Sequence, residues 1–183
     1  LTWRAETASA QVKSAILLAG LVADVPVEVH EGVPTRDHTE RMLVARGVDV
    51  RAGDGTVTLV PRARLYAADQ HVPGDPSSAA FFAALAALSE SGELALDDVC
   101  INPSRAGAFR VLRRMGVRLS YEGTRTAGGE EVARVVVAPG SLQGTDIGGA
   151  EVPSLIDELP VLACVAACAD GETRVTGAAD LRV

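Results

Sequence analysis

The sequence predicts an α/β chain built from copies of one unit, the last of which is incomplete. Three observations support this fold class. Short strand-like segments alternate with apolar helical segments along the chain. Helix-capping residues and glycines separate these segments. Two stretches of the chain also repeat one another in register, because the residues around Ser9 recur around Ser78, 69 positions later.

The first copy begins with a helix over 10–19, for which Ser9 is a favourable N-cap and Gly20 lies near the end. This segment is apolar nearly all round, and such helices are usually buried. We therefore expect other elements to enclose it. An alternating pattern over 25–30 then predicts a strand.

A second helix and a hairpin complete the first copy. The helix is capped by Thr35 or by Asp37 and is stopped by Gly47. Two strands follow, over 48–51 and 56–60, and a Gly-Asp-Gly turn joins them.

The second copy repeats this order of elements. The residues related by 69 positions are Ser9 and Ser78, Ala10 and Ala79, Arg36 and Arg105, Leu43 and Leu112, Gly47 and Gly116, and Val48 and Val117. We expect helices over 78–88 and 104–115, a strand over 94–101, and two further strands on either side of Gly128-Gly129. A third copy supplies only a helix over 157–169 and a strand over 172–177, so its sheet is expected to lack a covering helix.

The composition limits the function classes. The chain has 183 residues, 48% of them hydrophobic, and a net charge of −7. It can therefore form a core, and it has no general basic surface for nucleic acid or an anionic membrane. Three cysteines are too few for a disulfide framework, and no export or membrane-spanning segment is visible, so we expect a cytoplasmic protein.

The repeat suggests where an anionic ligand could bind. Ser9, Ser78 and Asp157 are each predicted at the start of a buried helix, where unpaired N–H groups and a partial positive charge favour anions. Arg36 and Arg105 mark the starts of the second helices and are candidate phosphate ligands. All five residues could equally serve as helix caps or as solvated helix-start residues.

Five segments spread over nearly the whole chain share a further pattern: SAQVKSA at 9–15, PTRDHTERML at 34–43, PGDPSSA at 73–79, NPSR at 102–105 and IDELP at 156–160. In sequence and in order they resemble the 5-enolpyruvylshikimate-3-phosphate (EPSP) synthase family. The resemblance implies repeated βαβαββ units forming the inside-out barrel of the enolpyruvyl transferases, here truncated. Residues 1–71 would be the C-terminal part of the N-terminal domain, and 72–183 the first part of the C-terminal domain, ending mid-repeat.

The resemblance also implies an activity. Family members transfer the enolpyruvyl group of phosphoenolpyruvate to the 5-hydroxyl of shikimate 3-phosphate and release phosphate. This step belongs to the shikimate pathway, which leads to chorismate and the aromatic amino acids, and it is the target of glyphosate. No metal or organic cofactor is implied, and the parent protein is expected to be a monomer.

Site residues follow from the same resemblance. Ser9, the Ala10 backbone and Gln11 correspond to ligands of shikimate 3-phosphate, and Gln11 also to a ligand of phosphoenolpyruvate. Arg36 corresponds to a further ligand of the shikimate phosphate. Asp157 corresponds to the catalytic aspartate, which would accept the proton of the attacking hydroxyl.

Parts of the family pattern are absent from this chain. An amino-terminal Lys-Ser-Arg stretch and an Asn-Ser-Gly-Thr segment are not present, and the Lys-Glu-Ser-Asp-Arg motif expected directly after Leu181-Arg182-Val183 is missing. We therefore expect the chain alone to be inactive, although the parent protein is a transferase. Self-association of the chain is left open.

Two alternatives remain at this point. One is the cell-wall enzyme that transfers enolpyruvyl to UDP-N-acetylglucosamine on the same fold and uses a loop cysteine. Cys100, Cys164 and Cys168 disfavour it, because they fall on a predicted strand and in a helix predicted to be buried. The other is a non-catalytic module that binds anions.

Overall fold

A computed structural model describes residues 1–6, 8–61, 65–149 and 151–181. Arg182 and Val183 therefore lie outside the described residues. The chain forms two compact units: unit 1 comprises Leu1–Val72 with Ala127–Glu130, and unit 2 comprises Pro73–Thr126 with Glu131–Val183. The assignment of 1–71 and 72–183 to the two domains of the family stays a prediction.

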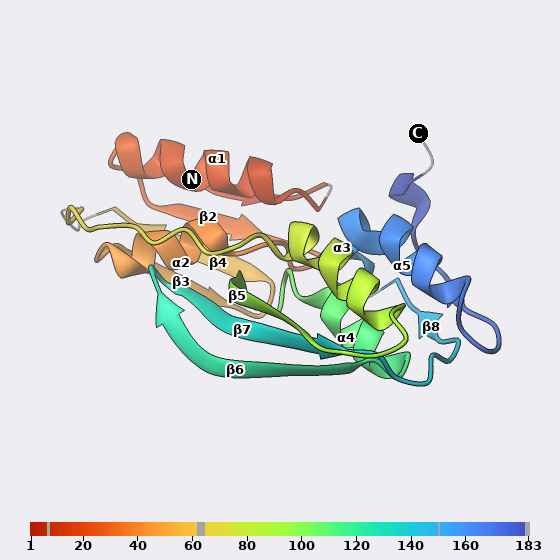
Figure 1. The fold of residues 1–183 in the computed structure, drawn as a ribbon. Coiled ribbons are helices and arrows are strands. Elements are labelled where there is room, and N and C mark those ends of the chain that lie inside the picture. The colour runs from red at the N-terminus through yellow and green to blue at the C-terminus, as the bar shows by residue number, and fades with distance from the viewer. Residues whose placement is uncertain (7, 62–64, 150, 182–183) are drawn as a thin grey trace. The chain divides into compact units, whose positions relative to one another are not determined.

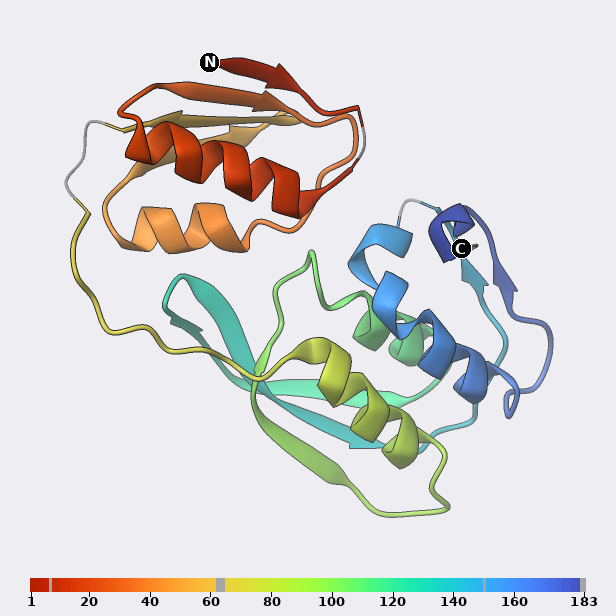
Figure 2. The same cartoon turned by 90° about the horizontal axis from the view of Figure 1, so that it is seen from above.

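Unit 1 is a four-stranded sheet with two helices. The strands lie in the order β1 (Thr2–Arg4), β2 (Val27–His30), β4 (Thr56–Val60) and β3 (Asp49–Gly53), with β1 parallel to β2 and the other pairs antiparallel. The helices are α1 (Ala10–Val22) and α2 (His38–Ala45), and Figure 2 shows both on one side of the sheet. The apolar side chains between helices and sheet are Leu17, Val27, Val29, Leu43, Val57 and Leu59.

The predicted hairpin of unit 1 is confirmed. Gly53 pairs with Thr56, so Asp54 and Gly55 form a two-residue turn, with φ of 50° and 71°. Positive φ at both central residues is the requirement of the turn that suits antiparallel strands best, and Asp-Gly meets it. Strand β1, which pairs with β2, was missed.

Helix α1 is less enclosed than its composition predicts. Its N-cap is Ser9, as expected, but only Lys13, Leu17 and Gly20 are buried. Val12 is 42% exposed and Val22 is 88% exposed. The prediction of a helix buried all round is therefore wrong here, since one stripe alone faces the sheet, and that stripe includes a lysine.

Unit 2 contains a three-stranded sheet in the order β5 (Leu94–Cys100), β7 (Glu130–Ala138) and β6 (Arg118–Ala127). Helix α3 (Pro76–Ala87) packs against β5, α4 (Gly107–Arg114) and α5 (Leu159–Ala166). Strands β8 (Asp146–Ile147) and β9 (Arg174–Val175) form a small parallel pair. Figure 1 shows the long β6–β7 hairpin along one side of this unit.

A close contact fixes the segment between β8 and α5. This segment contains two short 3₁₀ turns, η1 (Val152–Ser154) and η2 (Ile156–Glu158), and a third, η3 (Ala179–Leu181), follows β9. A Cβ atom on Gly107, in the first turn of α4, would lie 2.7 Å from the Ser154 carbonyl oxygen. Only glycine allows this approach. It holds η1 against α4, and η2, which carries Asp157, follows directly.

The start of α3 is anchored by main-chain bonds. The Gly74 N–H donates to the Asp98 carbonyl at 2.7 Å, and the Cys100 N–H donates to the Gly74 carbonyl at 2.9 Å. These bonds pair Gly74 with Val99, next to a bulge in β5 at which Asp98 takes a φ of 58°. Gly74, the residue before the N-cap Asp75, is thus held to the sheet by its backbone.

The cysteines differ from expectation in part. Cys100 is buried in β5, but Cys164 in α5 and Cys168 after it are exposed. The predicted burial of their helix face is therefore wrong, because α5 buries Leu159, Leu162 and Val165 and turns the face with Cys164 outward. Within the part of the chain that the structure describes, no helix is both long and apolar enough to cross a membrane.

Candidate functional site

In unit 1, the predicted ligands of an anion lie at the start of α1 and in the loop before α2. Ser9 has extended backbone geometry, and its Oγ accepts from the Val12 N–H at 3.4 Å and donates to the Gln11 Oε1 at 3.5 Å. Ala10 is the first residue of the helix, and Gln11 is exposed. First-turn N–H groups have no partner within the helix, so this end offers donors to an anion.

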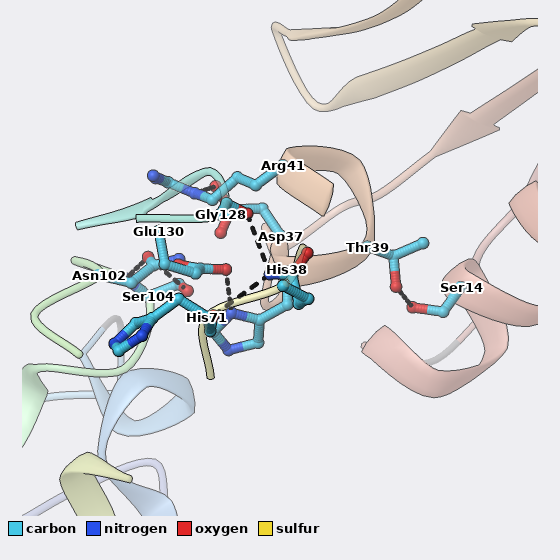
Figure 3. Close-up of polar contacts among 11 residues, drawn as sticks. Ser14, Asp37, His38, Thr39, Arg41, His71, Asn102, Ser104, Gly128 and Glu130 are labelled. Atoms are coloured by element: carbon cyan, nitrogen blue, oxygen red, sulfur yellow. Dashed lines mark hydrogen bonds and ion pairs between the residues drawn. The ribbon is translucent and has the colours of Figure 1, made fainter. Parts of the chain in front are cut away.

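Arg36 lies in the loop that joins β2 to α2 and is partly buried. Asp37 occupies the N-cap position of α2, as one of the two predicted alternatives, but its side chain makes no capping bond. Instead it accepts from Arg41 Nε at 2.8 Å (Figure 3). The chain thus places Arg36 directly before a helix start, where a guanidinium can add a bidentate contact to an anion.

In unit 2, the start of α3 is built around Asp75. Its carboxylate accepts from the N–H groups of Ser77 at 3.2 Å and of Ser78 at 3.0 Å, and from the Ser78 hydroxyl at 2.9 Å. Burial by itself would raise the pKa of Asp75, but these bonds and the nearby Arg105 charge lower it below its ordinary value. Asp75 is therefore the N-cap of α3.

The prediction that α3 starts at Ser78 is wrong by two residues. Ser78 is the third residue of the helix, and Pro76 is the first. Proline is favoured at the first helical position, because it lacks the N–H that would be unpaired there. The Asp75-Pro76 pair was a sequence signal for this helix start.

Arg105 is bound by carboxylates of the chain itself. Its side chain is 12% exposed, and Nη2 donates to Asp75 Oδ1 at 2.9 Å and to Ser77 Oγ at 2.7 Å. Its Nη1 lies 3.6 Å from Asp157 Oδ2. The predicted phosphate-binding role of Arg105 is not supported by these contacts, whereas a role in orienting Asp157 is.

Asp157 and Glu158 lie in the η2 turn before α5, in different environments. The Asp157 side chain is 54% exposed. Glu158 is 3% exposed, and its carboxylate accepts a short hydrogen bond from the Ser77 hydroxyl. Burial raises the pKa of Glu158 above its ordinary value, and the bonds from Ser77 and the charge of Arg105 oppose this only in part.

The prediction that Asp157 begins a regular helix is therefore wrong. Residues 156–158 form a separate 3₁₀ turn, and Glu158 holds the N-cap position of α5 without a capping bond. Sequence reasoning also missed Glu158 as a buried partner of Ser77. The only sequence hint of this contact was the presence of two adjacent polar pairs, Ser77-Ser78 and Asp157-Glu158. In the structure, each pair has one exposed member and one that faces inward.

These arrangements have distinct chemical capacities. Unit 1 offers hydroxyl, amide and guanidinium donors, which suit a phosphate or carboxylate group. Unit 2 offers a partly exposed carboxylate, Asp157, held by Arg105, which suits hydrogen bonding to hydroxyl groups and acceptance of a proton. Among the described residues, no group of three or more His, Cys, Asp or Glu side chains is arranged to hold a metal ion.

The fold and these polar helix starts define an α/β protein of repeated units with anion-binding potential. The family model described as EPSP synthase (3-phosphoshikimate 1-carboxyvinyltransferase) matches residues 1–183. The chain therefore belongs to the EPSP synthase family, as the sequence resemblance predicted.

Individual relatives agree. A 3-phosphoshikimate 1-carboxyvinyltransferase of Desulforudis audaxviator is 50% identical over 183 residues, and one of Limosilactobacillus fermentum is 47% identical over 180 residues. They cover 100% and 97% of this chain, which spans 43% and 41% of their lengths. The chain is thus less than half as long as these relatives.

Solved structures show the same relation. EPSP synthase from Acinetobacter baumannii superposes with a TM-score of 0.93 at 46% identity, covering 100% of this chain and 41% of that one. The enolpyruvyl transferase NikO from Streptomyces tendae has a TM-score of 0.63 at 21% identity, covering 87% and 37%. The second likeness shows the fold alone, and together they confirm the predicted α/β fold class of the enolpyruvyl transferases.

Proposed function

We propose that this chain is part of a 3-phosphoshikimate 1-carboxyvinyltransferase. In the complete enzyme, the 5-hydroxyl of shikimate 3-phosphate adds across the C2=C3 double bond of phosphoenolpyruvate: its oxygen bonds to C2 as the hydroxyl proton leaves, and C3 takes up a proton. The tetrahedral intermediate then loses phosphate from C2 and a proton from C3, which restores the double bond. The observation that carries this proposal is the family match over the whole chain, at up to 50% identity among the relatives described. The substrates, the cytoplasmic location and a monomeric parent belong to the proposal.

Unit 1 is proposed to supply ligands of shikimate 3-phosphate. Ser9 Oγ, the N–H of Ala10 and the Gln11 amide lie together at the start of α1, where the helix dipole favours a negative charge. Arg36 would add a charge-assisted contact to the phosphate, and Gln11 a contact to phosphoenolpyruvate. These groups bind and orient anions, and positioning two reactants in this way accounts for a large share of catalysis in general.

Unit 2 is proposed to supply the catalytic carboxylate. Asp157 would hold the shikimate hydroxyls and accept the proton of the attacking 5-hydroxyl. Its side chain is 54% exposed, and the nearby Arg105 would limit its orientation. Glu158 is buried and accepts a hydrogen bond from the Ser77 hydroxyl, which suits a structural contact.

Titration of the chain with shikimate 3-phosphate tests the proposal by calorimetry. We expect saturable binding, and Arg36→Ala should weaken it by about tenfold or more, because a charge-assisted hydrogen bond is lost. The matched control is Arg51→Ala, since Arg51 is 78% exposed on β3 and pairs with Asp49. Absence of saturable binding, or equal loss in both variants, would contradict the unit 1 site and favour a non-catalytic module.

A further inference from the structure

Three charged side chains are buried inside unit 1 without a role in the proposed chemistry. Lys13 of α1 is 2% exposed, and its Nζ lies 3.0 Å from Glu31 Oε2 and 2.7 Å from Glu40 Oε1. Glu31 directly follows β2, and Glu40 lies in α2. The two glutamate side chains are 7% and 6% exposed. Charged residues are almost never this buried unless they are paired.

The three residues belong to elements that also pack around the apolar core of unit 1. Lys13 connects α1 to the end of β2 and to α2, and next to it the Ser14 and Thr39 hydroxyls are 2.7 Å apart (Figure 3). A buried ion pair is weak support for stability, because well-packed apolar side chains of similar volume often serve as well or better. What this pairing does provide is a constraint on the relative positions of α1, α2 and the end of β2.

The loop that carries Arg36 lies between two of these residues. Its first residue, Glu31, is held by its backbone, because the Glu31 N–H donates to the Gly55 carbonyl at 2.7 Å. Within the loop, the Thr35 hydroxyl donates to Glu31 Oε1 at 2.5 Å. The same carboxylate therefore binds Lys13 with one oxygen and the neighbour of Arg36 with the other.

Lys13 also stands in a fixed relation to the start of α1. The Lys13 backbone N–H donates to the Ser9 carbonyl at 3.1 Å, in the first turn of the helix. A continuous path of contacts thus runs from the Ser9 end of α1 through Lys13 and Glu31 to Thr35.

We propose that Lys13 and Glu31 are positioning residues, which hold the Arg36 loop in register with the Ser9 end of α1 so that both can bind one anion. The proposal rests on the proposed function for its ligand, shikimate 3-phosphate. The contacts that define it lie entirely within unit 1 and touch no reacting atom. Glu31 is the central member, since a carboxylate offers both acceptor oxygens that the two bonds require.

Glu31→Gln tests this role, because an amide has one acceptor oxygen and cannot bind Lys13 and Thr35 in the same way. We expect the loop amides of Val33, Thr35 and Arg36 to exchange hydrogen about tenfold faster, and the affinity for shikimate 3-phosphate to fall by about tenfold. Thr35→Val keeps the Lys13 ion pairs and should produce both changes without a large shift in the urea midpoint of unit 1.

Glu28→Gln is the matched control. Glu28 lies on β2, three residues before Glu31, and its side chain is 45% exposed and pairs with His30. Loop exchange and affinity should both remain at wild-type values in this variant. Unchanged loop exchange in Glu31→Gln and Thr35→Val, or equal acceleration in Glu28→Gln, would overturn the positioning role.

The two measurements separate this inference from the proposed function. Hydrogen exchange needs no ligand, so faster loop exchange in Glu31→Gln and Thr35→Val alone supports the positioning of the loop. Failure of the wild-type chain to bind shikimate 3-phosphate would instead contradict the proposed function. Normal affinity in a variant whose loop exchanges faster would overturn the link between loop position and binding.

Discussion

The starts of α1 and α3 hold equivalent places in the repeat, yet their polar residues have different partners. Ser9 caps α1 itself, and the adjacent Gln11 is exposed. Its counterpart Ser78 lies inside α3 and binds Asp75, which is the cap. Both copies of the unit therefore keep the helix, but the N-cap is at a different position in each, Ser9 in one and Asp75 in the other.

The arginines that the repeat relates, Arg36 and Arg105, also differ in their partners. Arg36 lies in a loop of unit 1, which we propose is held through Glu31 and Thr35. Its counterpart Arg105 is nearly buried among Asp75, Ser77 and Asp157. Arg105 thus organises carboxylates of its own unit, whereas we propose that Arg36 binds an external anion.

The largest effect should come from Asp157. In the complete parent enzyme, Asp157→Ala should lower kcat by about a hundred- to ten-thousand-fold, the range expected when a general base is removed. The affinity for shikimate 3-phosphate should change only a few-fold if the ligand is bound chiefly by unit 1 residues. Steady-state kinetics and calorimetry measure the two quantities.

A suitable control for this substitution is Asp97→Ala, because Asp97 is 73% exposed and forms a surface ion pair with Arg134. Wild-type turnover is expected for it. Unchanged kcat in Asp157→Ala would remove its catalytic role, and a loss of affinity as large as that of Arg36→Ala would erase the contrast between the two units.

An intermediate effect should distinguish the two helix caps. Asp75→Ala should reduce the free energy of unfolding by about 1–2 kcal/mol, since it removes a cap that binds two N–H groups. Ser78→Ala should cost less than about 0.5 kcal/mol, because Ser78 is not a cap. Urea denaturation followed by circular dichroism gives both values.

Ser9→Ala completes this comparison in unit 1, with an expected cost of about 0.5–1 kcal/mol, because the Ser9 capping bond is long at 3.4 Å. Trp3, the single tryptophan of the chain, packs against the core of unit 1 and reports its unfolding by fluorescence. A larger cost for Ser78→Ala than for Asp75→Ala would show that the repeat does keep its cap at the serine.

The smallest effect is a pH dependence at Glu158. Its pKa in the folded state is raised, so the folded state favours the protonated acid more than the unfolded state does. The resulting stability is present below the ordinary pKa and is lost as the pH rises through the raised value. Relative to Glu158→Gln, the wild type should therefore lose stability as the pH rises from the ordinary glutamate pKa through the raised pKa of Glu158.

Stability curves of both proteins across this pH range provide the measurement. Glutamine retains an acceptor for the Ser77 hydroxyl and cannot ionise, so it isolates the charge. A constant difference between the two proteins over the whole range would contradict the assigned direction of the pKa shift.

Local sequence signals were sufficient for much of the fold. The Ser9 cap, the turn at Asp54 and Gly55, and strand β5 all follow from short patterns, and the structure confirms them. The short strand β1 carried no such signal, because three residues show no clear alternation, and its place depends on pairing with β2.

The candidate site was harder to predict where a residue depends on distant partners. Lys13 lies in an otherwise mostly apolar helix, and its burial depends on Glu31 and Glu40, which come from other elements. Glu158 likewise depends on Ser77, which lies 81 positions away. Such pairings follow from the tertiary arrangement, and no local periodicity encodes them.

The main-chain bonds between Gly74 and β5 bear on how this protein could be redesigned. Because they involve N–H and C=O groups alone, they survive any exchange of the side chains that come immediately after Gly74. Position 74 itself leaves little room, since an added Cβ would lie 3.3 Å from the Asp98 carbonyl oxygen. Directed evolution of Ser77 and Ser78 can therefore alter the chemistry at the N-terminus of α3 without displacing the helix axis.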